Sequence, residues 1–224
     1  MSMDPKPVVF NQPWGFSKLD VFRSCPAKFR YQFIDKLPQG SSPAMERGSK
    51  MHENIEMYLN GWAKELMPET AAWKDAFDAI KAESFKGEQS IGINKNWQLL
   101  PDWFGPTTWL RVKMDAYFVE GDEMTVIDFK SGQYRIPSQD QIELYAVAGL
   151  SINPEVQKVN AEFWFIDANE VHKVVYTREQ LLELRKKYER ESLSMYNERL
   201  WTPEPSRECR WCPYSKTKGG KCRF

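Results

Sequence analysis

Apolar residues recur at every third or fourth position along much of the first 80 residues, the spacing of helices that bury one face. Residue types that mark helix ends occur at matching places. Ser17 can cap a helix, Pro26 suits a first helical turn, and Gly61 can end a helix. The pattern predicts four helices, over residues 17–24, 27–36, 44–60 and 73–80.

At residue 109 the spacing of apolar residues changes from the helical period to strict alternation with polar residues. Apolar and polar side chains alternate along 109–119, which indicates a strand with one buried face and one wet face. Gly121-Asp122 is a turn signal, and residues 124–130 predict a second strand. The two strands are therefore predicted to form a hairpin.

The remaining segments alternate between helix and strand signals. Two capping boxes mark helix starts, Ser138 with Gln141 and Thr177 with Gln180. In chain order, the pattern predicts a helix over 138–149, two strands over 156–166 and 171–176 joined around Asn169, and a long charged helix from 177 toward Trp201. This order predicts an α/β fold with a mixed central sheet flanked by helices. Since no linker-like stretch divides the chain, we expect a single domain over 1–224.

Composition narrows the function classes. Lys plus Arg and Asp plus Glu both number 31, so the net charge is zero, which excludes a generic basic nucleic-acid coat and leaves DNA binding to a local patch. No uncharged run, 144–154 included, is longer than 11 residues, which is too few to span a membrane, and no secretory signal is visible. We expect a cytoplasmic protein, in which four cysteines are more often metal ligands than disulfides.

Two carboxylates are predicted to face each other across the first hairpin. A hairpin centred on the Gly-Asp turn pairs residues whose numbers add up to 243, which places Asp115 opposite Asp128 with Cβ atoms about 5 Å apart. Like charges in this arrangement call for a cation, and Mg²⁺ or Mn²⁺ prefers such oxygen ligands. Lys130 shares a strand face with Asp128, where its ammonium can orient or deprotonate a water.

Metal, carboxylates and lysine together suit phosphodiester hydrolysis. Because Asp128 and Lys130 are expected on the wet face, their alanine variants are expected to fold but not to cleave. The alternative is a solvated strand without a catalytic role, since a single D-x-K occurs by chance in very many proteins.

Five segments follow one another in a specific order. They are FSKLDVFRSCPAKF, GSKMHE with His52, VKMDAYF with Asp115, VIDFKSG with Asp128 and Lys130, and QIELY with Gln141 and Tyr145. In this order they resemble the PD-(D/E)xK nuclease superfamily. The similar branch holds RecB and AddB nuclease domains, CRISPR-associated adaptation exonucleases, and phage and prokaryotic recombination exonucleases. The resemblance implies a restriction-endonuclease-like catalytic core over 44–176, with a metal-cluster region over 16–37 and 201–224.

The resemblance also implies a role for each site residue. Lys130 would be the catalytic lysine, and the acidic residue that often precedes the first motif has only Glu53 and Glu56 as stand-ins. The implied catalytic residues are His52, Asp115, Asp128, Lys130, Gln141 and Tyr145. The implied ligands of Mg²⁺ or Mn²⁺ are His52, Asp115, Asp128 and the carbonyl of Phe129.

Simpler interpretations stay open for three of these residues. His52 lies on an apolar helical stripe, where a histidine is often part of the core. Gln141 can serve only as the second member of a capping box. Tyr145 can be a core aromatic residue.

All four cysteines fit one metal-binding set. Cys209 and Cys212 form a C-x-x-C pair, Cys222 follows after nine residues, and Cys25 lies far upstream. Four thiolates suit a [4Fe–4S] cluster or a tetrahedral zinc ion. The resemblance favours the [4Fe–4S] cluster, because iron–sulfur nucleases of that branch combine one distant cysteine with a C-terminal trio.

Positive charge gathers near these cysteines. Residues 207–224 carry a net charge of +5 and residues 18–36 a net charge of +3. Such a surface can follow a phosphate backbone while its aromatic residues stack on bases. The proposed DNA-binding residues are Arg210, Trp211, Lys216, Lys218 and Lys221, with Tyr214 and Phe224 as further stacking residues. The alternative is that these aromatic residues shield the cluster.

The expected function is a Mg²⁺- or Mn²⁺-dependent deoxyribonuclease. We expect an exonuclease that favours single-stranded DNA or duplex ends, in recombination or repair, phage DNA processing or CRISPR adaptation, within a prokaryotic cell or a phage-infected host. A recombination or CRISPR-adaptation protein is the expected partner. Two alternatives stay open: a non-catalytic DNA-end-binding iron–sulfur module of a larger complex, and an RNA nuclease. No G-x-x-x-x-G-K-[ST] motif occurs, so no nucleotide motor is predicted.

Overall fold

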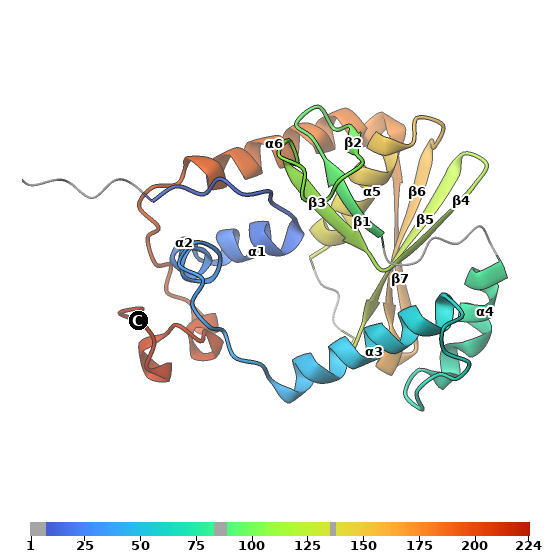
Figure 1. The fold of residues 1–224 in the computed structure, drawn as a ribbon, viewed down its shortest axis with the longest axis horizontal. Helices are drawn as coiled ribbons and strands as arrows, with labels where there is room; N and C mark the ends of the chain where they lie inside the picture. Colours follow the sequence, from blue (N-terminus) through green and yellow to red (C-terminus); the bar gives the residue numbers. More distant parts are fainter. Residues whose placement is uncertain (1–7, 83–88, 135–137) are drawn as a thin grey trace, which may run out of the picture. The chain divides into compact units, whose positions relative to one another are not determined.

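A computed structural model covers the 224-residue chain and describes residues 8–82, 89–134 and 138–224 (Figure 1). The chain forms two compact units. The terminal unit combines Met1–Ser41 with Lys186–Phe224, and the central unit is Ser42–Arg185. In the described residues no helix is long and apolar enough to cross a membrane. Residues 1–7, on which the expectation about a secretory signal depends, lie outside this description.

The central unit holds two sheets. The smaller has the order β2-β1-β3 with antiparallel pairing, and comprises β1 (Gln89–Ile93), β2 (Leu99–Leu100) and β3 (Leu110–Met114). The larger has the order β4-β5-β6-β7 and comprises β4 (Ala116–Glu120), β5 (Glu123–Lys130), β6 (Lys158–Phe165) and β7 (Glu170–Thr177). In the larger sheet β5 and β6 run parallel and the other neighbours antiparallel, so the predicted mixed sheet is confirmed.

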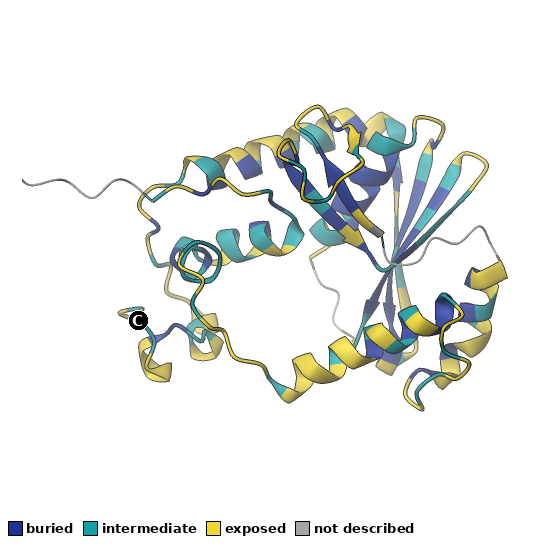
Figure 2. Ribbon diagram, viewed as in Figure 1, coloured by how far each residue is buried: buried dark blue, intermediate teal, exposed yellow. Residues whose placement is uncertain are grey.

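Helices cover both faces of the larger sheet. α5 (Asp140–Ile152) packs on β5 and β6 and is buried along most of its length (Figure 2). Gly149 allows this close approach, because a Cβ there would lie 2.6 Å from the sulfur of Met124 on β5. α3 (Pro43–Leu59) and α4 (Lys74–Ala82), which follows a short 3₁₀ turn at Ala71–Trp73, contribute to the core on the opposite face.

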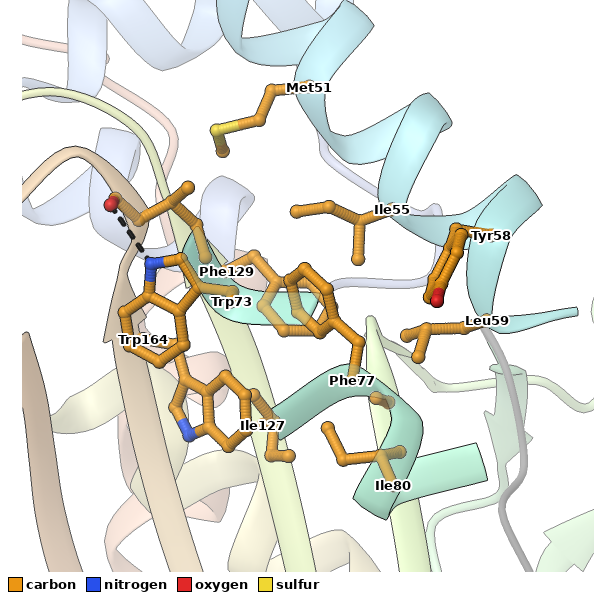
Figure 3. Close-up of a cluster of buried hydrophobic side chains, with 12 residues drawn as sticks. Met51, Ile55, Tyr58, Leu59, Trp73, Phe77, Ile80, Ile127, Phe129 and Trp164 are labelled. Atoms are coloured by element: carbon orange, nitrogen blue, oxygen red, sulfur yellow. Dashed lines mark hydrogen bonds between the residues drawn. The ribbon is translucent and has the colours of Figure 1, made fainter. Parts of the chain in front are cut away.

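The core between α3, α4 and the sheet is rich in aromatic residues (Figure 3). Phe77 is fully buried, with the rings of Trp73, Phe129 and Trp164 at centroid distances of 5.7–6.5 Å. The indole nitrogen of Trp73 donates a hydrogen bond of 3.0 Å to the carbonyl of Ile166. That carbonyl lies just beyond the end of β6, so the bond ties the turn before α4 to the sheet.

The terminal unit is built from both ends of the chain. Its helices are α1 (Phe16–Ser24), α2 (Pro26–Phe29), a π-helical turn η1 (Arg30–Ile34), and the C-terminal part of α6 (Leu181–Asn197), followed by 3₁₀ turns η5 (Arg207–Trp211) and η6 (Lys216–Lys218). Phe29 is buried at its centre, stacked on Trp201 at 5.5 Å and edge-on to Phe10 at 5.0 Å. Packing of these rings joins the N-terminal helices to the segment after α6.

Several sequence predictions are confirmed by the structure. The hairpin of β4 and β5 pairs residues whose numbers add up to 243, from Ala116 with Ile127 to Glu120 with Glu123. The second hairpin turns at Asn169, which has a positive φ of 54°. The capping box of Thr177 and Gln180 is present, at a 3₁₀ turn over Arg178–Gln180 that leads into α6.

Other predictions were wrong. The strand predicted over 109–119 is two strands in different sheets, because the chain bends at Asp115. α1 begins after Gly15 without a side-chain cap, so Ser17 is not its cap. α5 likewise begins after Gln139 without a side-chain cap, so Ser138 does not cap it. The hydroxyl of Ser138 instead donates a hydrogen bond of 2.8 Å to the carboxylate of Asp140.

The remaining differences concern elements rather than caps. The second predicted helix continues after Phe29 as a π-helical turn. β1 and β2 were not predicted, because their short segments contain neither a long alternation nor a strong turn signal.

Replacing Phe77 with alanine tests the aromatic core. Because Phe77 is fully buried among other rings, Phe77→Ala is expected to lower the free energy of unfolding by about 3–5 kcal/mol. Urea denaturation followed by tryptophan fluorescence measures the change. The control is Phe104→Ala, because this ring is 77% exposed and its loss is expected to change stability by less than about 0.5 kcal/mol. Equal stability of the two variants would contradict this account of the core.

Candidate functional site

The last residues of β5 carry the centre of the candidate site. Asp128 and Lys130 project from the face of β5 that α5 covers, while Ile127 and Phe129 project into the aromatic core on the other face. Asp128 is 3% exposed, so the expectation that it lies on a wet face is wrong. The reason is that α5 covers this face, which the alternation of a single strand does not reveal.

Lys130 neutralises the buried carboxylate of Asp128. Its Nζ lies 2.7 Å from Oδ2 of Asp128 and donates a hydrogen bond of 2.8 Å to Oε1 of Gln141. The same ammonium lies 5.1 Å from the ring centre of Phe163 on the neighbouring strand β6. Lys130 is therefore held from three directions.

Two residues one turn apart on α5 hold the other carboxylate oxygen. Nε2 of Gln141 donates a hydrogen bond of 2.6 Å to Oδ1 of Asp128, and it lies 2.9 Å from the hydroxyl of Tyr145. That hydroxyl lies 3.3 Å from the same Oδ1 and can donate to it. Gln141 thus contacts site residues rather than capping α5, and Tyr145 contacts the site while its ring is buried.

Asp115 lies at the bend between β3 and β4, in neither strand. Its Oδ2 accepts a hydrogen bond of 2.9 Å from the backbone N–H of Phe129 and lies 3.3 Å from Nδ1 of His52 on α3. The prediction that Asp115 lies directly opposite Asp128 in the hairpin was wrong, because the β4–β5 ladder begins at Ala116. It nevertheless contacts the residue that follows Asp128.

The electrostatics of the site depend on burial and on these close charges. Burial raises the pKa of Asp128 to about 6, although the charge of Lys130 acts in the opposite direction. Burial lowers the pKa of His52, but the hydrogen bond and negative charge of Asp115 outweigh it, so this pKa lies above its usual value. Burial next to two carboxylates raises the pKa of Tyr145. Each carboxylate thus lies against a basic side chain, Asp128 against Lys130 and Asp115 against His52.

An open cleft of the central unit makes the His52 and Asp115 side of this arrangement accessible to ligands. His52, Asp115 and Lys113 line it together with Glu53 and Glu56, the two acidic residues considered as stand-ins. Small residues widen the cleft at the start of α3 and after β5: Ala44, Gly48, Ser49 and Ser131.

The donor chemistry of this cleft fits a divalent metal ion. Carboxylate oxygens and an imidazole nitrogen are suitable ligands for Mg²⁺ or Mn²⁺. Among the described residues no hydrogen bond reaches Oδ1 of Asp115, which leaves this atom available. In the described part of the chain, no three His, Cys, Asp or Glu side chains are already grouped for a metal ion. His52 and Lys130 instead lie against the two carboxylates.

One structural support of the site was missed by the sequence analysis. Arg47 of α3 forms two hydrogen bonds of 2.8 and 2.6 Å with the carboxylate of Asp167, which follows β6. The carboxylate also accepts the backbone N–H of Gly132, two residues after Lys130. These contacts connect α3 to the end of β5, and no local signal indicates them, because Arg47 and Asp167 are 120 residues apart.

The four cysteines line one small cavity in the terminal unit. Two backbone N–H groups, of Lys28 and Glu204, each lie 3.5 Å from the sulfur of Cys25. The backbone N–H of Ser206 donates a hydrogen bond of 3.4 Å to the sulfur of Cys209. Cys212 and Cys222 complete the set, and none of the four forms a disulfide. Such N–H contacts stabilise the negative charge of thiolate ligands.

The basic C-terminal residues lie on the surface of the same unit. Trp211 is 69% exposed, with the guanidinium of Arg210 5.4 Å from its ring centre. The other predicted DNA-binding residues, Lys216, Lys218 and Lys221, are also exposed. Tyr214 is different, since its ring is buried and its hydroxyl donates a hydrogen bond of 3.1 Å to the carbonyl of Leu37. The expectation that Tyr214 stacks on bases is therefore wrong.

Comparison with known proteins identifies the family. A family model described as PD-(D/E)XK nuclease superfamily matches residues 13–217. The chain therefore belongs to the PD-(D/E)XK nuclease superfamily. Membership indicates a nuclease with a nucleic-acid substrate, and nucleases of this superfamily typically use a divalent metal ion.

A solved structure supports the fold. The crystal structure of SSO0001 matches with a TM-score of 0.50 and 15% sequence identity, over 97% of this chain and 89% of that chain. The likeness agrees with a restriction-endonuclease-like core of mixed sheet and helices. A search of curated proteins gave no match.

Removing the cation beside Asp128 tests the electrostatics of the site. Lys130→Met leaves a buried carboxylate without its cation, so the free energy of unfolding is expected to fall by about 3 kcal/mol in the presence of EDTA. Urea denaturation gives the value. The double variant Asp128→Asn/Lys130→Met removes the buried charge and is expected to regain most of this loss. A double variant as unstable as Lys130→Met would contradict the assignment of the loss to the unpaired carboxylate.

Proposed function

We propose that the protein is a Mg²⁺- or Mn²⁺-dependent deoxyribonuclease that acts as an exonuclease on DNA ends, with single-stranded DNA favoured. The observation that carries the proposal is the meeting of six side chains from four parts of the chain in one unit: His52, Asp115, Asp128, Lys130, Gln141 and Tyr145. A buried carboxylate, a lysine and two further polar groups in direct contact are costly for stability alone, and such arrangements are typical of catalytic sites.

His52, Asp115, Asp128 and the carbonyl of Phe129 are the proposed metal ligands. When bound there, Mg²⁺ or Mn²⁺ would supply Lewis-acid activation of the scissile phosphate and of water. The hydrogen bond from the N–H of Phe129 to Asp115 holds that carboxylate close to the end of β5. Asp128 is held by three neighbours, so both carboxylates are oriented before substrate binds.

Lys130 is the proposed catalytic lysine. An ammonium has three N–H donors, and Asp128 and Gln141 accept two of them. The third can orient the attacking water or stabilise a phosphate oxygen as charge develops. Gln141 has the role of a positioning residue, because it binds both the lysine and the carboxylate.

We further propose that the four cysteines hold a [4Fe–4S] cluster. The supporting observations are that all four line one cavity and that three backbone N–H groups lie near their sulfurs. In a four-iron cluster each thiolate binds a different iron atom, so the sulfurs are spaced more widely than around one zinc ion. The cluster would connect Cys25, between α1 and α2, to the C-terminal segment that carries Cys222.

The exposed basic residues around this cavity are the proposed DNA-binding surface of the terminal unit: Arg210, Trp211, Lys216, Lys218 and Lys221. Arginine and lysine side chains bind phosphates, and an exposed tryptophan stacks on unpaired bases. The proposed contexts are DNA recombination or repair, phage DNA processing, and CRISPR adaptation, with a protein of one of these pathways as partner.

Cleavage of end-labelled DNA tests the nuclease proposal. The wild-type protein, purified without oxygen and given Mn²⁺, is expected to produce a ladder from one end of single-stranded DNA. Lys130→Met and Asp128→Asn are expected to lower the rate at least about 100-fold, because each removes a group that contacts the reacting atoms. The matched control is Lys158→Met, since this lysine is ion-paired with Glu123 at the start of β5 rather than with a site residue.

The outcomes of this assay separate the alternatives. Cleavage by Lys130→Met at the wild-type rate would contradict the site assignment. Binding of DNA without cleavage by the wild type would favour the DNA-end-binding module. Cleavage of RNA but not DNA would identify an RNA nuclease.

Metal analysis tests the cluster proposal. The protein purified without oxygen is expected to be brown and to contain about four iron atoms and four sulfides per chain. Cys212→Ser is expected to lose the visible absorption and to unfold at lower temperature, while Ser215→Ala, which alters another residue lining the same cavity, is expected to keep the colour. A colourless protein with one zinc ion per chain would contradict the cluster.

A further inference from the structure

An exposed aromatic surface lies beside the smaller sheet of the central unit. Phe104 is 77% exposed, and the guanidinium of Arg111 on β3 lies 4.9 Å from its ring centre. The same guanidinium lies 5.3 Å from the ring of Trp103, and its Nε donates a hydrogen bond of 2.9 Å to the carbonyl of that residue. Phe104 and Arg111 therefore form one composite surface, with a flat cation below an exposed ring.

Hydrogen bonds within the loop hold Phe104 in place. Its backbone N–H donates a bond of 2.8 Å to the carboxylate of Asp102, and the hydroxyl of Thr108 donates one of 3.1 Å to the carbonyl of Asp102. That carbonyl packs against β1, because a Cβ on Gly92 would lie 3.0 Å from it. An exposed ring on a backbone held in this way needs little loop ordering when it binds a ligand.

β3 connects this surface to the candidate active site. Arg111 and Lys113 occupy alternate positions of β3, so their side chains share the face opposite its buried residues, and Asp115 follows at the bend after the strand. Lys113 and Asp115 line the same cleft. At about 3.3 Å per residue, Arg111 lies about 10 Å from the end of β3, where the chain bends at Asp115. An extended nucleic-acid strand covers this distance in a few nucleotides.

We propose that Phe104 and Arg111 form a subsite that binds an unpaired nucleotide of the substrate strand, with Lys113 contacting the backbone between this nucleotide and the scissile phosphate. This inference rests on the proposed nuclease function and adds a specificity determinant to it. Cations spaced along one strand face complement a phosphate backbone, and the exposed ring offers a stacking surface for a base. In a paired duplex the base faces are already stacked, so the subsite favours single-stranded DNA.

Binding measurements test the subsite without requiring cleavage. The probe is a fluorescein-labelled oligothymidine of about 16 nucleotides, and anisotropy is recorded with the full-length protein in EDTA. Phe104→Ala is expected to weaken binding about 10-fold through loss of stacking, and Phe104→Trp is expected to retain it. The matched control, Trp62→Ala, removes an aromatic ring that is 71% exposed on the loop after α3 and is expected to leave binding unchanged.

The salt dependence of binding distinguishes the two members of the subsite. Arg111→Gln is expected to reduce the slope of log affinity against log salt concentration by about 1, because the cation that would bind the phosphate of the unpaired nucleotide is lost. Phe104→Ala is expected to lower affinity at unchanged slope, because an uncharged ring releases no counterion.

Two results would overturn the inference. The first is that Phe104→Ala binds the oligothymidine as tightly as the wild type does. The second is that Phe104→Ala loses as much affinity for a blunt duplex as for the oligothymidine, which would exclude recognition of an unpaired base. Both results come from binding measurements. They can therefore be distinguished from failure of the nuclease proposal, which would appear as absence of cleavage by the wild type. A urea midpoint of Phe104→Ala equal to that of the wild type separates lost binding from lost structure.

Discussion

The burial of the Asp128 carboxylate is the constraint on which the candidate site depends. β5 lies inside a sheet covered on both faces, so an ionised group on it needs a cation and hydrogen-bond donors within direct reach. Lys130 supplies the cation, while Gln141 and Tyr145 supply donors from α5. The requirements of folding and of the proposed chemistry therefore involve the same groups. Packing of α5 fixes their geometry as well as covering the core.

The second constraint is the bend of the chain at Asp115. β3 belongs to the smaller sheet and β4 to the larger, so Asp115 lies where the chain passes from one sheet to the other. Its carboxylate is outside both ladders and can bind the N–H of Phe129 and contact His52. The cleft opens at this point. The strand that leads into it carries the basic residues Arg111 and Lys113, which gives the smaller sheet a proposed role in holding substrate.

The terminal unit is assembled from segments at opposite ends of the chain, so its stability depends on contacts between these segments. Ring packing of Phe29 with Phe10 and Trp201 buries apolar surface between them. The cavity lined by Cys25 and the three C-terminal cysteines lies in the same unit. Closing so long a loop costs conformational entropy, and a metal cluster bound by both segments would offset part of this cost.

The sequence by itself determined the elements whose signals are local: most helices, both hairpins, the register of β4 with β5, and the D-x-K motif with its order relative to His52 and Gln141. Alternation and turn residues are properties of a few neighbouring positions, so they can be read without a fold. Only the tertiary structure decided that Asp128 is buried, that Gln141 binds Lys130 instead of capping α5, and that Arg47 reaches Asp167. Each of these depends on which distant element covers a given face, and burial and long-range pairing are set by packing across the whole unit, which no local pattern encodes.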